Sequence, residues 1–169
     1  MSLRTRKTVS ADTMSSLRCL VMPLSQGFAL LPSALVQALL YNEQVEQPTV
    51  DAPPWLLGSV YRDACGTVPL ISLDAVFGWS LPQHDIGHIA LLRHVSSEGL
   101  PPFFALRLSG APWVVEADSA NVVRTPRAVP LPCVACDISL DGQPGVIPDL
   151  DQLGDLIASL PPAKTARPD

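Results

Sequence analysis

Proline recurs throughout this chain and limits which backbone structures it can form. Eighteen of the 169 residues are proline, about twice the roughly 5% of an average protein. Because proline lacks a backbone N–H and fixes φ, it interrupts long helices and is confined to edges, ends and bulges of sheets. The apolar fraction of 47% and the charged fraction of 16% are typical of a folded protein. These features predict short strands joined by turns around a mainly aliphatic core.

Short apolar segments recur along the chain and are separated by turn residues. Strands are predicted over residues 17–24, 28–31, 88–94, 103–108, 112–117, 121–124, 133–140 and 145–147, and on both sides of a polar turn within residues 54–73. Regularly spaced short strands favour small β-barrels over a parallel sheet with crossover helices. The sequence therefore predicts a mainly all-β fold, in one domain or in two subdomains that share a core.

Local signals predict how some of these segments are joined. Ser33 is expected to cap a short helical turn that runs to Leu40. The Ser-Gly pair at 109–110 is expected to join the strands on either side of it as a hairpin. The Asp-Gly pair at 141–142 is the strongest hairpin signal of the chain, because both residue types suit the positive φ of a tight type I′ turn.

A helix is predicted near the end of the chain. Asp149 stands three residues before Gln152, as in a capping box. Apolar side chains then recur at helical spacing, at Leu150, Leu153, Leu156, Ile157 and Leu160. Two prolines at 161–162 end the helix, and residues 161–169 are expected to form a disordered tail.

The net charge of −5 is unevenly distributed. The first 18 residues hold four basic side chains and one acidic one, so the remainder of the chain sums to −8. An acidic body argues against a nucleic-acid partner, because phosphate contacts need a basic face. Residues 1–15, rich in Ser, Thr and Arg, are expected to be a disordered and solvated tail.

No segment is predicted to insert into a membrane. The longest mostly apolar run, residues 28–41, is shorter than the roughly 20 residues that span a bilayer, and it contains Pro32, Ser33 and Gln37. The N-terminal region lacks the apolar core of a signal peptide. A cytoplasmic location is therefore expected, with the four cysteines as reduced thiols.

The most informative stretch is PWLLGSVYRDACGTVPLISL, residues 54–73, with two apolar strands around a turn that carries an arginine, an aspartate and a glycine. Upstream is the strand-turn-strand segment CLVMPLSQGFALLP, and downstream are WVVEADS (113–119), DISLDG (137–142) and the leucine-rich helix. In this order the segments resemble CheW-like domains, the adaptors that join chemoreceptors to a CheA-type histidine kinase. The resemblance covers about residues 17–160.

This resemblance implies a fold and a set of partners. The fold is two intertwined five-stranded SH3-like β-barrels within residues 16–160, one from about 17–75 with the C-terminal segment and the other from about 76–148. The function is a non-enzymatic adaptor that binds the regulatory domain of a CheA-like kinase and the cytoplasmic tip of a chemoreceptor, recruited to receptor arrays. The Pro-Leu-Ile-Ser sequence at 69–72 resembles the corresponding segment of ChpC-type proteins of the type IV pilus and twitching pathway.

Partner binding is expected at the hairpin within residues 54–73. Arg62 lies beside Tyr61 and Asp63 on a rigid turn, a composition typical of interface hot spots. Val60 and Val68 flank the turn on its two strands and are included in the expected surface. The alternative interpretation is that Arg62 is a solvated turn charge.

The spacing around Arg62 departs from the family pattern. Family members usually place this arginine five residues after the glycine and five before the proline, whereas Arg62 stands four after Gly58 and seven before Pro69. The direction in which Arg62 points is therefore left open by the resemblance. Trp55 and Trp79 are further candidates, as binding anchors or as core residues, with the core favoured for Trp55.

Cysteine and histidine residues suggest a different class of function. Cys133 and Cys136 form a CxxC pair, and His84 and His88 stand four apart, so a zinc site or a thiol-redox pair can be drawn from them. The extended stretch after Pro132 argues against both, because cysteines three apart on a strand face opposite sides. No catalytic, metal-binding or cofactor-binding residue is assigned, since the common catalytic motifs are missing from the sequence.

Overall fold

The computed structural model describes residues 15–81, 87–95 and 101–161. Its strands are β1 (Leu17–Leu24), β2 (Gly27–Pro32), β3 (Val36–Tyr41), β4 (Leu56–Arg62), β5 (Gly66–Ile71), β6 (His88–Arg93), β7 (Phe103–Leu108), β8 (Trp113–Ala117), β9 (Val122–Thr125), β10 (Val134–Leu140) and β11 (Gln143–Pro148). The helical elements of this part are η1 (Ser33–Leu35), α1 (Leu73–Val76) and α2 (Leu150–Ala158).

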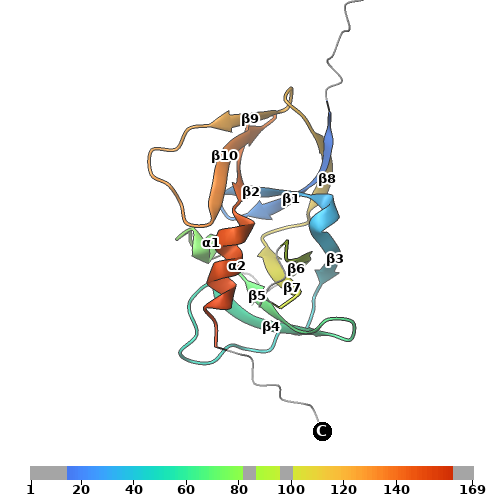
Figure 1. Ribbon diagram of the computed structural model, residues 1–169, viewed down its shortest axis with the longest axis vertical. Coiled ribbons are helices and arrows are strands. Elements are labelled where there is room, and N and C mark those ends of the chain that lie inside the picture. The colour runs from blue at the N-terminus through green and yellow to red at the C-terminus, as the bar shows by residue number, and fades with distance from the viewer. Residues whose placement is uncertain (1–14, 82–86, 96–100, 162–169) are drawn as a thin grey trace, which may run out of the picture.

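The strands form two sheets, one above the other in Figure 1. The first sheet has six strands in the order β8-β1-β2-β11-β10-β9, and the second has five in the order β3-β6-β7-β5-β4. Most neighbours are antiparallel, but β2 pairs in parallel with β11, and β5 pairs in parallel with β7. The first sheet therefore joins the two ends of the described chain, and the second is built from the segment between them.

Buried side chains fall into three clusters, because alternate residues of a strand face opposite sides of its sheet. The first sheet curves around one cluster and is called the first barrel; its inside is filled by Cys19, Val21, Phe28, Leu30, Ile138 and Leu140. The second sheet curves around another cluster and is called the second barrel; its inside is filled by Leu40, Val60, Val68, Leu70, Ile89, Leu91 and Ala105. The largest cluster lies between the sheets and includes Leu20, Met22 and Leu31 of the first with Leu92, Phe104 and Leu106 of the second. The two barrels therefore share a core.

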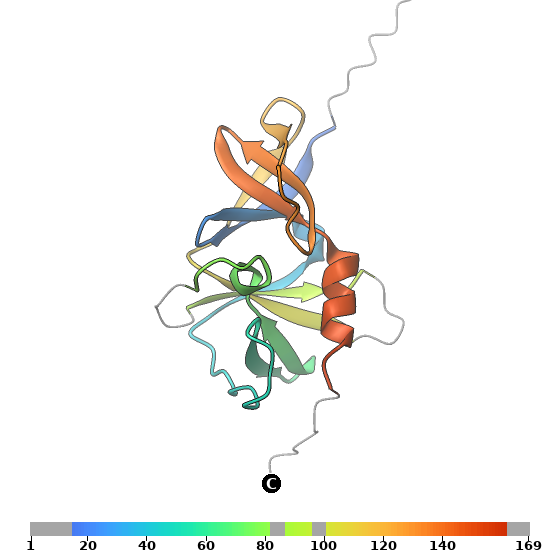
Figure 2. The ribbon, with the colours of Figure 1, turned by 90° about the vertical axis from the view of Figure 1, so that its left-hand side faces the viewer.

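Helix α2 packs against this shared core. Leu153 and Ile157 are buried in it, and the helix runs alongside the barrels in Figure 2. The Asp149 carboxylate accepts hydrogen bonds from the backbone N–H groups of Asp151 and Gln152, which satisfies the first turn. The predicted cap and apolar stripe are confirmed. The reciprocal half of the capping box does not form: the Asp149 N–H donates to the Cys133 carbonyl oxygen, and the Gln152 side-chain NH₂ donates to the Asp149 carboxylate.

The mainly β fold with a C-terminal helix, expected from the sequence, is confirmed. The Asp-Gly turn at 141–142 joins β10 to β11 as predicted. Within the described residues, no helix is both long and apolar enough to cross a membrane.

The helical turn expected from Ser33 to Leu40 is wrong beyond its first three residues, and Ser33 does not cap it: the turn follows Pro32, and the Ser33 hydroxyl donates to the Arg18 carbonyl oxygen. Only η1 is helical there, and the following residues form β3, which pairs with β6. Ala, Leu and Gln favour a helix in isolation, but the partner strand supplies hydrogen bonds that a single turn cannot match.

The hairpin expected around residues 109–110 is also wrong. Strands β7 and β8 both form, but β7 pairs with β6 and β5 in the second sheet, while β8 pairs with β1 in the first. The connection crosses between sheets, and the Ser109 N–H donates to the Pro23 carbonyl oxygen. The sheets consequently do not follow the expected division near residue 75. The first takes β1, β2 and β8 to β11, and the second takes β3 to β7.

Candidate partner-binding interface

The second barrel is closed by a seam next to the hairpin that the sequence singles out. Residues 43–46, which follow β3, approach β4, and Glu46 and Ser59 exchange backbone hydrogen bonds of 2.8 and 2.9 Å. Gly58 makes this approach possible. Its φ is +138°, and a Cβ at this position would overlap the Glu46 carbonyl oxygen. The glycine of the Trp-Leu-Leu-Gly stretch thus serves barrel closure.

Arg62 reinforces the same seam. Its guanidinium Nη1 lies 3.1 Å from Glu43 Oε1, and the two side chains are 38% and 29% exposed. Arg62 is therefore neither a freely projecting hot spot nor a simple solvated charge. It holds the segment after β3 against the end of β4, and part of its surface remains open to a partner.

The turn after Arg62 presents the exposed part of the hairpin. The Cys65 N–H donates to the Arg62 carbonyl oxygen over 3.0 Å, and Gly66 follows with a φ of +71°, as the predicted bend requires. Tyr61 is 65% exposed and Asp63 is also exposed. Tyrosine with an acidic neighbour on a rigid turn suits protein recognition.

Val60 and Val68 correct one part of the expected surface. They face each other across β4 and β5, and both are buried inside the second barrel. Their side chains fix the hairpin from within and are not available for direct contact with a partner. Of the five expected site residues, Tyr61, Arg62 and Asp63 reach the surface.

Other exposed apolar side chains lie on β3, the strand that leads into the seam. Leu39 and Tyr41 of β3 are both exposed, and the Tyr41 ring lies 4.8 Å from the His88 ring on the neighbouring strand. Trp55 and Trp79 are partly buried and pack against the shared core, Trp79 edge-on to Phe77. The core role favoured for Trp55 agrees with this packing.

A buried carboxylate ties the two barrels together. Asp74, at the start of α1, is 2% exposed, and its Oδ1 accepts hydrogen bonds from Ser25 Oγ at 2.7 Å and from Ser25 N at 2.9 Å. Ser25 lies in the β1–β2 turn of the first sheet, so this contact links the two barrels. No local pattern predicts this contact, because the two residues are 49 positions apart in the chain.

The residues of the alternative metal or thiol site are dispersed. Cys133 is buried in the shared core, Cys136 packs against the first barrel, and His88 belongs to the second sheet. His84 lies outside the described residues. No group of three or more His, Cys, Asp or Glu side chains within the described part is placed to hold a metal ion. This arrangement gives the zinc or redox alternative no geometric support.

Burial also suppresses thiolate formation at two of the cysteines. Desolvation raises the pKa of the Cys133 thiol, and the nearby Asp149 charge raises it further. Burial likewise raises the pKa of Cys19, with a smaller contribution from Glu116. Raised thiol pKa values are the opposite of what nucleophilic or redox cysteines need.

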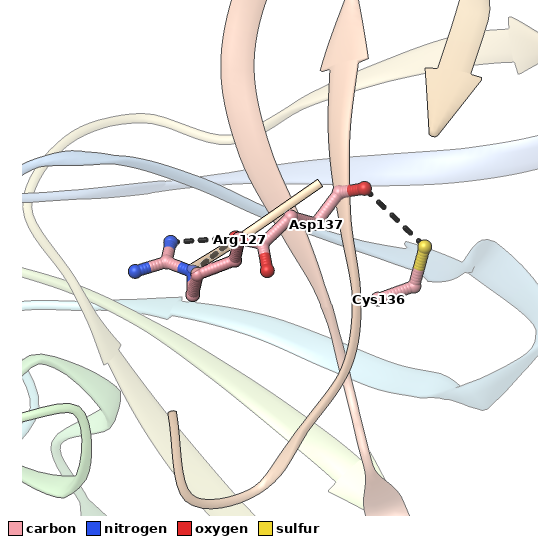
Figure 3. A network of polar contacts seen from close by, with 3 residues as sticks. All are labelled: Arg127, Cys136 and Asp137. Carbon is pink, nitrogen blue, oxygen red and sulfur yellow. Dashed lines mark hydrogen bonds and ion pairs between the residues drawn. The ribbon is translucent and has the colours of Figure 1, made fainter. Parts of the chain in front are cut away.

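A polar network on the first barrel was not foreseen from the sequence (Figure 3). Arg127, in the connection between β9 and β10, donates from Nε to Asp137 Oδ1 over 2.7 Å and also pairs through Nη2. This hydrogen bond raises the pKa of the Arg127 guanidinium. The Cys136 thiol donates to the Asp137 carbonyl oxygen over 3.3 Å. The Cys136 thiol thus bonds to the backbone next to it, on the opposite face of β10 from the Arg127–Asp137 pair.

Comparison with known proteins bears on the fold. A scan against protein-family models finds no match, and a search of curated proteins finds none. Among solved structures the chain is similar to the scaffolding protein TtCheW from Thermoanaerobacter tengcongensis. The TM-score is 0.63 and the identity 14%, over 79% of this chain and 89% of that one. The fold is CheW-like. At this identity the likeness is one of fold, and the partners of the chain belong to the proposal below.

Proposed function

We propose that this chain is a non-catalytic signalling adaptor that binds a chemoreceptor's cytoplasmic tip and the regulatory domain of a CheA-like histidine kinase. The observation that carries the proposal is the CheW-like fold, shared over most of the chain with a protein described as a scaffold. The ordered segments between residues 17 and 160 support it independently of the structure. In this proposal the adaptor acts in the cytoplasm, at receptor arrays.

The mechanism that suits this body is geometric. An adaptor must hold two partners in a fixed relation, so that a change in one shifts the population of states of the other. The shared core and the Asp74–Ser25 contact join the two barrels into such a rigid unit. A pocket with converging titratable groups, which an enzyme needs, has no place in this mechanism.

The proposed contact surface is the exposed part of the β4–β5 hairpin. Tyr61 provides the apolar area and Asp63 provides the charge, while Arg62 and Glu43 fix the hairpin at the seam. We expect Tyr61→Ala to weaken capture of the kinase regulatory domain or of the receptor fragment by about tenfold, the loss typical of an aromatic hot spot. Pull-down with each purified partner measures this.

Trp113→Ala is the matched control. Trp113 is 51% exposed and lies on β8 of the first sheet, whereas Tyr61 lies on β4 of the second. Loss of capture with Trp113→Ala and not with Tyr61→Ala would move the interface to the first sheet. Absence of capture by the unmodified protein, with any CheA-like kinase or receptor offered, would refute the adaptor proposal itself.

A second comparison separates two roles of Arg62. Arg62→Ala removes both its ion pair and any direct partner contact, whereas Glu43→Ala removes the ion pair and leaves the guanidinium in place. Direct binding predicts that Arg62→Ala loses capture and Glu43→Ala keeps it. Equal losses in the two variants would show that Arg62 acts only by holding the seam.

The proposal also names the pathway in which the adaptor acts. The Pro-Leu-Ile-Ser segment at 69–72 favours a ChpC-type role in type IV pilus and twitching control over flagellar chemotaxis. Capture of a pilus-pathway kinase in preference to a flagellar one, from equal amounts of the two regulatory domains, would support this assignment. The reverse preference would place the adaptor in the flagellar system.

A further inference from the structure

The first barrel has an open strand edge beside the polar network of Figure 3. Strand β9 pairs with β10 only from Leu140 to Asp137, whereas β11 pairs with β10 as far as Val134. Val134 and Cys136 pair with β11, with Ala135 at a bulge between them, and none of the three residues pairs with β9. This side of β10 is therefore an edge to which a further strand can add.

The connection between β9 and β10 leaves room along this edge. It carries three prolines, at positions 126, 130 and 132, and bows outward from the sheet in Figure 1. Between the connection and the edge lies an open cleft of about 520 Å³, within the 300–1,000 Å³ range of ligand sites. Its lining includes Leu131, Val134 and Ala135 as apolar surface.

The charges of the cleft are basic in an otherwise acidic chain. Arg124, Arg127 and Asp137 line it, so its formal charge is +1. Asp137 holds Arg127 in place and leaves its Nη1 without a hydrogen bond within the described part of the chain. Arg124 is exposed, and no described residue forms an ion pair with it.

From this geometry we propose that the cleft binds an acidic peptide segment of a partner protein in extended conformation. The segment adds to β10 at residues 134–136, in the place that β9 would occupy if it continued beyond Thr125. Backbone hydrogen bonds to the edge supply affinity, and Arg124 with Arg127 selects carboxylate side chains. The cleft lies on the first barrel, whereas the hairpin of the proposed adaptor interface belongs to the second, so this inference does not depend on that interface.

The test uses a pool of eight-residue peptides that alternate glutamate with random apolar residues, added to the ¹⁵N-labelled full chain. We expect amide shifts confined to residues 124–137. Arg124→Gln should weaken binding about tenfold, the loss of one charge-assisted hydrogen bond. Arg93→Gln, an exposed arginine bonded to Gln37 on the second barrel, is the matched control and should bind unchanged.

Two further peptide pools test the binding mode. Replacing glutamate by lysine should abolish the shifts, and N-methylation of all backbone amides should abolish them even though the carboxylates remain. The proposal is overturned if the lysine or N-methylated pools bind as well as the parent pool. It is also overturned if free glutamate gives the same shifts, if they fall elsewhere, or if none appear at 1 mM peptide.

Discussion

Substituting Gly58 by alanine tests whether barrel closure depends on that glycine. An added Cβ would overlap the backbone carbonyl oxygen of Glu46 and approach the Val45 side chain. Because the obstacle is mainly backbone, it cannot be relieved by rotating a side chain. The segment at 43–46 must move away from β4, and the two backbone hydrogen bonds between Glu46 and Ser59 are then lost.

The expected loss of stability follows from two contributions. Two backbone hydrogen bonds contribute about 1–3 kcal/mol in total. Holding a non-glycine residue at a φ of +138° costs about a further 1–3 kcal/mol. The free energy of unfolding should therefore fall by about 2–6 kcal/mol, a large part of the roughly 5–15 kcal/mol of a typical domain.

Gly66→Ala is the control in the same hairpin. Gly66 has a φ of +71°, but a Cβ there would meet no atom within 4 Å. Its substitution should cost only the conformational term, about 1–2 kcal/mol. Urea unfolding followed by circular dichroism measures both variants, and hydrogen exchange at the Glu46 and Ser59 amides reports on the seam itself.

The reasoning is refuted if Gly58→Ala loses no more stability than Gly66→Ala. It is equally refuted if the Glu46 and Ser59 amides stay as protected as in the unmodified chain.

Three further predictions concern individual groups. Burial lowers the pKa of His94 below its ordinary 6.5, so the unfolded chain binds a proton more readily than the folded one, and stability falls as the pH drops below about 6.5. Replacing the imidazole in His94→Phe should flatten the dependence of the urea midpoint on pH between 7 and 5. An unchanged dependence would contradict this. Iodoacetamide at pH 7.5 should modify Cys19 and Cys133 more slowly than Cys65, and mass spectrometry showing them modified first would oppose the burial argument. Asp149→Ala should cost about 1 kcal/mol of unfolding free energy through the lost helix cap, and no loss in urea unfolding would count against the cap.

Local signals in the sequence predicted local structure well. The Asp-Gly turn at 141–142 and the cap at Asp149 depend on neighbours within a few residues, and both form as expected. The bend at Gly66 is of the same kind. Each signal is local because the residues that define it also make its hydrogen bonds.

Structure that depends on distant partners could not be predicted in the same way. The segment after Ser33 has the composition of a helix, yet it becomes a strand because β6 lies beside it. The Ser-Gly pair at 109–110 is a plausible tight turn, but its flanking strands pair with different sheets. No pattern within either segment identifies the partner strand.

In the candidate site, too, the features that depend on neighbouring residues were predicted, and those that depend on distant residues were not. The exposure of Tyr61 and Asp63 on a hairpin followed from the turn residues around them. The pairing of Arg62 with Glu43 did not, because Glu43 belongs to a polar connection whose path depends on closure of the barrel. Val60 and Val68 were expected at the surface, since the pattern of a short strand does not by itself show which face is enclosed.

The arrangement of the first sheet has a consequence for how the chain folds during synthesis. Strands β1 and β2 are synthesised before the other described strands, but their sheet is completed only by β8 to β11, with Ala29 pairing in register with Val146. The second sheet, made entirely of β3 to β7, can form while the chain is still being synthesised, before β8 to β11 are available to pair with the first two strands. During that interval the apolar β1–β2 hairpin is left uncovered, and exposed apolar surface of this kind is prone to aggregation.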